Sequence, residues 1–192
     1  EQDNSPFDTQ VVTTNGIVTG VFDDGFFIQD GTGAWNGLYV FDDSESPAVG
    51  DDVTITGTVD EFYGLTELVD VSAMTVNSSG NASPTPVVLS TMDANQEAYE
   101  CVLVTVEGEC TNADLGFGEF ELDDGSGACR VDDLLFLFSA QETLMYNVTG
   151  LNYYSFGDFK IVPRDEDDVL VASPVFFTVT PEEWDLTTSS MT

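Results

Sequence analysis

The chain has 192 residues, of which 42% are apolar, and its 36 Asp and Glu against 3 Lys and Arg give a formal net charge of −33. This charge is far beyond the magnitude of about 2 to 8 that suffices for solubility, so salt or bound cations must screen the self-repulsion. Three basic residues cannot neutralise a run of phosphates, which disfavours nucleic acid as a partner. No apolar stretch reaches the roughly 18 to 20 residues of a membrane span.

The residue inventory argues against an enzyme. The chain contains no His, the side chain that most often serves as general base and metal ligand. Ser-His-Asp triads and Cys-His zinc sites are therefore excluded, and no Walker or dinucleotide-binding glycine loop is present. Paired carboxylates can run glycoside hydrolysis, but that chemistry needs a substrate cleft, for which a small barrel filled by its own side chains offers little room.

Composition also bears on location. The very low Lys content resembles that of proteins bathed in salt outside the cell, and Glu1 looks like a processed end. We therefore expect a secreted, extracellular protein.

The chain opens with a polar N-terminal extension, residues 1–10, and a first β unit follows over residues 11–76. Turn dipeptides punctuate this unit, among them Asn15-Gly16 and Asp24-Gly25. Five strands in roughly 65 residues match a small Greek-key barrel. The expected strands lie within 11–22, Phe26–Gln29, Leu38–Phe41, Val53–Val59 and Leu65–Val71.

A linker is expected over residues 77–88, which are rich in Ser and Pro and favour an extended chain. It separates the first unit from a second one over residues 89–172. Leu89–Tyr99 is predicted to form the one short helix, with Ser90 as its N-cap and Asp93 near its positive end. The strands expected after it are Cys101–Cys110, Gly118–Leu122, Ala128–Val131, Leu144–Leu151 and Phe159–Val162.

The two units are copies of one module. Phe26–Ala34 returns as Phe120–Ala128, and Val53–Gly57 corresponds to Tyr146–Gly150 at nearly the same offset. Matching order and spacing indicate a tandem duplication. The second copy alone carries the apolar run Leu134–Phe138, which is either core or a docking patch.

These motifs resemble the tandem OB-fold segments of secreted bacterial proteins, including the YhcR-like OB group found beside extracellular nuclease domains. The matching motifs of the first copy are Gly16–Thr19, Gly25–Gly33 and Val49–Val59, and those of the second are Val102–Val106, Phe117–Phe120, Asp123–Gly127 and Phe156–Ile161. The resemblance implies an all-β protein of two tandem five-stranded OB-fold-like Greek-key barrels, with one short helix and extended terminal segments. Relatives beside nucleases are suspected of holding nucleic acid, but this chain lacks both the nuclease domain and the basic surface.

The C-terminal extension, residues 173–192, contains a strand that neither five-stranded unit needs. Its residues are Val175, Phe176, Phe177, Thr178, Val179 and Thr180. The strand either packs across its own barrels or adds to the sheet of a neighbouring molecule.

Paired aspartates raise the question of calcium, which takes six to eight hard oxygen ligands in flexible loops. The best candidate cluster is Asp123, Asp124, Asp132 and Asp133, although none of the pairs has EF-hand spacing. Asp before Gly also caps its own backbone in turns. Ca²⁺ is therefore a possible ligand and no cofactor is certain.

Three cysteines lie in the second copy, which allows one disulfide and leaves one thiol over. If Val102, Val104 and Val106 face inward, strand alternation gives Cys110 the same side and Cys101 the other. Cys129 shares its side with Val131. The preferred bridge is Cys110 with Cys129. A β-bulge would reverse the alternation on which this choice rests.

Aromatic residues supply a possible ligand face, with Trp35, Tyr63 and Tyr154 as its main candidates. Such rings stack on bases or sugars, but packing in the core and on strand faces accounts for them as well. The additional members are Tyr39, Phe62, Tyr153 and Phe156.

The sequence thus supports two hypotheses about function. The first is a secreted, non-enzymatic structural protein that self-associates into a homo-oligomer or polymer, such as an extracellular fibre or surface layer, by donating its terminal strand. The alternative is an accessory ligand-binding module for nucleic acid or polysaccharide.

Overall fold

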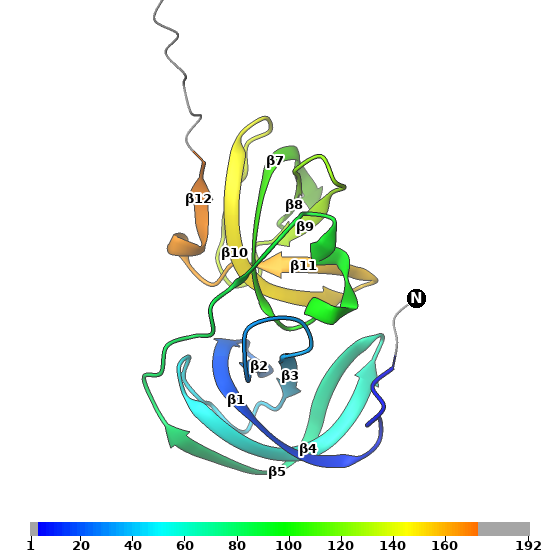
Figure 1. Cartoon of the computed structure of the whole chain (residues 1–192), viewed down its shortest axis with the longest axis vertical. Helices are drawn as coiled ribbons and strands as arrows, with labels where there is room; N and C mark the ends of the chain where they lie inside the picture. Colours follow the sequence, from blue (N-terminus) through cyan, green and yellow to red (C-terminus); the bar gives the residue numbers. More distant parts are fainter. Residues whose placement is uncertain (1–3, 173–192) are drawn as a thin grey trace, which may run out of the picture.

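The computed structural model describes residues 4–172, which form two β-barrels stacked along the long axis of the molecule (Figure 1). Within this range the only helical elements are three single turns of 3-10 helix. The predicted all-β class is confirmed. None of the helices described is long and apolar enough to cross a membrane.

The first barrel is closed in the order β1-β2-β3-β5-β4. Strand alternation builds its core, because along β4 the side chains of Val53, Ile55 and Val59 are buried while the intervening threonines are partly exposed. The strands are β1 (Val11–Val21), β2 (Gly25–Gln29), β3 (Gly37–Phe41), β4 (Asp52–Phe62) and β5 (Leu65–Ser78).

The second barrel repeats this order as β7-β8-β9-β11-β10 and closes where β10 pairs with β7. Two short strands outside the predicted set widen it to seven strands: β6 (Val87–Leu89) lies parallel to β7, and β12 (Val169–Val171) lies antiparallel to β10. The others are β7 (Leu103–Gly116), β8 (Glu119–Asp123), β9 (Cys129–Asp132), β10 (Met145–Ser155) and β11 (Asp158–Val162).

The segment predicted as a helix forms two separate 3-10 turns, η1 (Asp93–Asn95) and η2 (Glu97–Tyr99). Ser90 does cap the first turn, since its hydroxyl accepts the Asp93 N–H at 3.1 Å. Gln96 is extended and interrupts the helix. The Asn152 side chain from β10 donates to the Ala94 and Tyr99 carbonyls, so tertiary hydrogen bonds replace helical ones. A third turn, η3, spans Glu166–Asp168.

A third hydrophobic core joins the two barrels. Phe27, Tyr39 and Leu65 come from the first barrel. The second barrel contributes Cys101, Leu103, Leu151 and Val162. A buried hydrogen bond crosses the same interface, from the Leu103 N–H to the Gln29 side-chain oxygen at 2.8 Å. The barrels are therefore held as one body.

The predicted disulfide between Cys110 and Cys129 is wrong, because all three cysteines are free and buried. Both side chains do face the core of the second barrel, as alternation indicated. However, Cys110 and Cys129 each pair with Leu122 from opposite sides of β8. Two strand spacings place their Cα atoms about 10 Å apart, beyond the roughly 7 Å that a disulfide spans.

The apolar run Leu134–Phe138 divides its side chains between core and surface. Phe136 and Phe138 pack on the core of the second barrel and Leu135 packs on the core between the barrels. Leu134 and Leu137 are exposed. Three of the five residues are therefore core, and the docking role stays a prediction for the other two.

The structure describes residues 4–10 of the N-terminal extension but not the predicted C-terminal strand. At the N-terminus, the Thr9 N–H donates to the Val59 carbonyl at 2.8 Å and Ser5 N–H donates to the Glu61 carboxylate at 2.7 Å, which attaches the extension to β4. The candidate assembly strand Val175–Thr180 lies outside the described residues.

Replacing Gln29 by Ala is expected to destabilise the protein by about 1 to 3 kcal/mol, because it leaves the buried Leu103 N–H without an acceptor. Urea unfolding measures the change. Gln10→Ala removes an exposed side-chain hydrogen bond to Pro6 and serves as the matched control, with little expected effect. Equal losses in the two variants would contradict the role assigned to Gln29.

The cysteines provide a second prediction. In the absence of reductant, DTNB is expected to titrate three thiols in denaturant and to react slowly with the native protein, since all three are free and buried. Burial also raises the pKa of Cys129 to about 12, which further suppresses the reactive thiolate. A single thiol in denaturant would show that a disulfide forms.

Candidate ligand-binding face

Three hairpins end in the same two-residue turn, an aromatic residue followed by Gly. Tyr63-Gly64 joins β4 to β5, Phe117-Gly118 joins β7 to β8, and Phe156-Gly157 joins β10 to β11. Both residues of each turn have positive φ, with values of 52°, 58° and 55° for the three aromatic residues. Positive φ at both positions defines a type I′ turn.

An aromatic residue is a poor choice for this position. Type I′ turns prefer Asn-Gly or Asp-Gly, and a bulky side chain in the left-handed region costs on the order of 1 to 2 kcal/mol. The three rings do not offset this cost by burial, since Tyr63 is 88% exposed, Phe117 99% and Phe156 97%. Folding therefore does not explain why these turns carry rings.

Two of the tips meet across the barrel interface. The β4–β5 and β10–β11 hairpins point to the same side of the molecule (Figure 1). Between them lies a pocket of about 580 Å³, which Tyr63 and Phe156 line. The remaining aromatic walls are Phe62, Tyr153 and Tyr154.

A second pocket of about 530 Å³ shares one lining residue, Phe156, with the first. Leu115, Phe117 and Leu134 form the rest of its apolar lining. The two pockets together carry a surface that we call the aromatic face, defined by Phe62, Tyr63, Phe117, Tyr154 and Phe156.

An ion-pair network supports the second pocket. Glu119 accepts from Arg130 at 2.7 Å and from Lys160 at 2.5 Å, and the Lys160 ammonium lies 5.5 Å from the centre of the Phe156 ring. Burial alone would raise the pKa of Glu119, but the hydrogen bonds from Lys160 and Arg130 outweigh it and lower the pKa. Glu119 therefore stays ionised and holds both cations in place.

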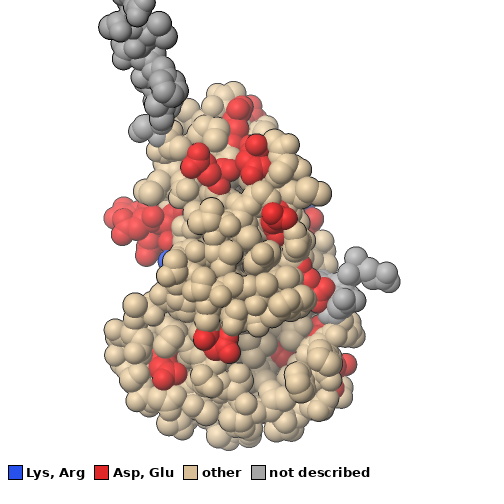
Figure 2. Space-filling view, viewed as in Figure 1, with Lys and Arg blue, Asp and Glu red and all other residues tan. Residues whose placement is uncertain are grey.

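The rest of the surface is acidic. Carboxylates are spread over both barrels on the side shown in Figure 2, where almost no Lys or Arg surface is visible. Each of the three cationic side chains is engaged: Arg130 and Lys160 in the network above, and Arg164 with Asp168 at 2.8 Å. The aromatic face thus offers exposed rings more than positive charge.

The predicted ligand residues are only partly brought together. Tyr63 and Tyr154 line the same pocket, whereas Trp35 lines a different one beside Glu97. The backbone N–H of Trp35 donates to the Ala98 carbonyl at 2.7 Å. Phe117 was missed. The signal that identifies it is the Phe-Gly dipeptide between two strands, which Phe156-Gly157 repeats.

Three of the four candidate calcium ligands have partners of their own. Hydrogen bonds from Ser126 and Thr91 lower the pKa of Asp124 to about 2. Asp123 accepts the Gly125 N–H at 2.7 Å, and Asp132 lies 3.5 Å from Lys160. Asp133 follows β9. Across residues 4–172, no three Asp, Glu, Cys or His side chains are arranged to hold a metal ion.

Comparison with known proteins gives similarities of structure alone. No family model and no curated protein matches the sequence. A murine DNA-binding protein bound to double-stranded DNA matches at 8% identity and a TM-score of 0.43, covering 84% of this chain and 96% of that one. The Ifi202 HINa domain in complex with DNA matches at 11% identity and a TM-score of 0.39, covering 86% and 96%. The p204 HINb domain matches at 13% identity and a TM-score of 0.38, covering 79% and 92%.

These comparisons correct two expectations. The strand order of the two barrels supports an OB-fold-like arrangement, but no comparison supports the YhcR-like bacterial group. The expected partners are also corrected: the sequence disfavoured nucleic acid and favoured a homopolymer, whereas two of the similar structures hold double-stranded DNA.

Replacing Tyr63, Phe117 and Phe156 together by Asn is expected to leave the fold intact and to raise the free energy of unfolding by roughly 0.5 to 1 kcal/mol per turn, because Asn suits a type I′ turn. Urea unfolding and circular dichroism measure the result. Marked destabilisation of the triple variant would show that the rings serve the fold.

Proposed function

We propose that this protein is a non-enzymatic ligand-binding module that holds an extended polymer by stacking its rings on the aromatic face. The observation that carries the proposal is the set of three exposed rings on type I′ turns, at positions where folding favours other residues. Nucleobases of single-stranded nucleic acid and sugar rings of a polysaccharide both offer the flat faces that stacking requires.

The location of the rings within the barrels supports this function. In OB-folds the loops that join strand 1 to strand 2 and strand 4 to strand 5 flank the surface that binds oligonucleotides and oligosaccharides. Tyr63 and Phe156 occupy the second of these loops in their barrels, and Phe117 occupies the first in the second barrel. The aromatic face therefore coincides with the loops that this fold uses for binding.

The spacing of the pockets supports a polymer over a single small molecule. Two pockets of about 580 and 530 Å³ share Phe156 and draw on both barrels, so a ligand that fills both contacts rings in succession. Stacking contributes about 1 to 3 kcal/mol per ring. Two or three such contacts yield useful affinity without a basic groove.

The proposal includes an extracellular location, which rests on composition, and the absence of catalysis, which rests on the residue inventory. The earlier hypothesis of fibre assembly depended on a strand outside the described residues and is replaced by the binding function.

The test measures binding of a single-stranded oligothymidylate and of a neutral oligosaccharide by isothermal titration calorimetry. Phe156→Asn and Tyr63→Asn are each expected to lower the affinity for the polymer about tenfold or more, because each removes one stacking contact. A salt series separates the ligand classes, since affinity for a phosphate polymer changes with salt whereas affinity for a neutral sugar does not.

Trp35→Asn is the matched control, because Trp35 is also exposed and has positive φ but lines a different pocket. Binding to the Trp35 variant is expected to equal that of the unmodified protein. Equal weakening in all three variants, or no binding of either polymer, would overturn the proposal.

A further inference from the structure

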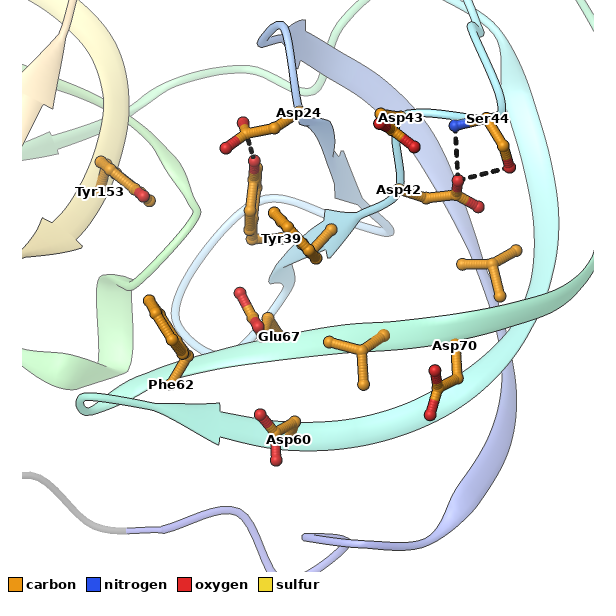
Figure 3. Close-up of a pocket in the computed structure, with 13 residues that line it drawn as sticks. Asp24, Tyr39, Asp42, Asp43, Ser44, Asp60, Phe62, Glu67, Asp70 and Tyr153 are labelled. Carbon is orange, nitrogen blue, oxygen red and sulfur yellow. Dashed lines mark hydrogen bonds between the residues drawn. The ribbon is translucent and has the colours of Figure 1, made fainter.

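A separate pocket of about 550 Å³ lies on the outside of the first barrel, where β3, β4 and β5 meet β10 of the second barrel (Figure 3). Carboxylates dominate its polar lining. They are Asp24, Asp42, Asp43, Asp60, Glu67 and Asp70. We call it the acidic pocket.

Glu67 is the unusual member of this set. Its neighbour Leu68 points into the barrel core, so alternation turns Glu67 outward, between Tyr39 on β3 and Asp60 on β4. The second barrel then covers it, and Glu67 is only 5% exposed. Figure 3 shows its side chain leaving β5 toward the space between Tyr39 and Phe62.

No hydrogen bond or ion pair is made by the Glu67 carboxylate to any of the described residues, although neighbouring carboxylates have partners. Asp24 accepts the Tyr39 hydroxyl at 2.8 Å, and Asp42 accepts the Ser44 N–H at 2.7 Å. Burial, with repulsion from Asp60 and Asp24, raises the pKa of Glu67 to about 7. The carboxylate opens onto the pocket, where partial burial weakens its hydration, and a cation placed beside it compensates for that loss.

Aromatic rings complete the pocket. Tyr39, Phe62 and Tyr153 line it together with Glu67, and the rings of Tyr39 and Tyr153 lie 5.9 Å apart. Aromatic faces attract organic cations, and the attraction strengthens when the cation is desolvated. A buried carboxylate beside three rings is therefore complementary to an ammonium group on an alkyl chain.

We propose that the acidic pocket binds an alkylammonium group, seated against the aromatic lining with its charge beside Glu67. Free polyamines and lysine side chains both carry this group. The proposal is independent of the polymer on the aromatic face.

The geometry favours an organic cation over a metal ion. Among residues 4–172 no three carboxylates converge as metal ligands, and Ca²⁺ requires six to eight oxygens at short range. The volume of about 550 Å³ falls in the range of small-molecule sites, which run from about 300 to 1,000 Å³. A chain of several carbons fills such a space, whereas a bare ion does not.

The test is a calorimetric titration of the full chain with spermidine and, separately, with a tetralysine peptide, at about 0.15 M salt to screen long-range attraction. Glu67→Gln keeps the shape of the side chain and removes its charge. It is expected to weaken binding about tenfold or more, as the loss of a charge-assisted contact does. Spermidine binding alone identifies a polyamine site, whereas tighter binding of the peptide identifies a lysine site.

Glu107→Gln is the matched control, because it makes the same change in net charge at an exposed position on β7 of the second barrel. Its affinity for spermidine is expected to stay within about twofold of the unmodified protein. Equal weakening in both variants would mean that the acidic surface attracts cations without a site. Binding of Ca²⁺ that depends on Glu67 and is not displaced by spermidine would also overturn the proposal.

The pH dependence provides a second readout. A cation favours the ionised form of Glu67, so affinity is expected to rise as the pH rises toward about 7 and to level off above it. Glu67→Gln should remove this rise, and a rise that persists in the variant would contradict the role of Glu67. The other titratable groups facing the pocket are Asp24 before β2, Tyr39 on β3, Asp42 and Asp43 after β3, Asp60 on β4, Asp70 on β5 and Tyr153 on β10.

Discussion

The packing of one barrel against the other is the constraint on which the rest of the structure depends. Phe27, Tyr39 and Leu65 face outward from their own barrel and are buried against residues of the second barrel. The Gln29 side chain fixes the register of this contact by accepting the Leu103 N–H. Because the interface is a true core, two hairpin tips from different barrels meet at one pocket, and neither barrel alone contains that pocket.

The same contact explains why β2 is buried along its whole length. All five residues of β2 are buried, since Phe26 and Ile28 fill the first barrel and Phe27 fills the interface. A strand on the surface of an isolated barrel would alternate between apolar and polar residues. The second copy shows the contrast, because Glu121 lies between the inward Phe120 and Leu122 on β8 and remains partly exposed.

The sequence was sufficient to predict the duplication, the turns and most strands, because those depend on local chemistry and alternation. It was not sufficient to predict contacts between side chains of different strands, because these depend on the order of the strands in the sheet. Alternation correctly predicted that the side chains of Cys110 and Cys129 face inward, but only the observed sheet order places Leu122 between them. In the same way Tyr63 and Tyr154 could be selected as rings, whereas their meeting depends on the angle between the barrels.

Departures from local rules occur at both proposed sites. Tyr63, Phe117 and Phe156 place bulky rings in the left-handed region, and Glu67 is a buried carboxylate without a partner among the described residues. Such conflicts are expected where function opposes stability. Phe62 and Tyr153 line both the acidic pocket and the pocket between the hairpin tips. A ligand at either site therefore contacts rings that the other site uses, and any resulting effect on affinity must be reciprocal.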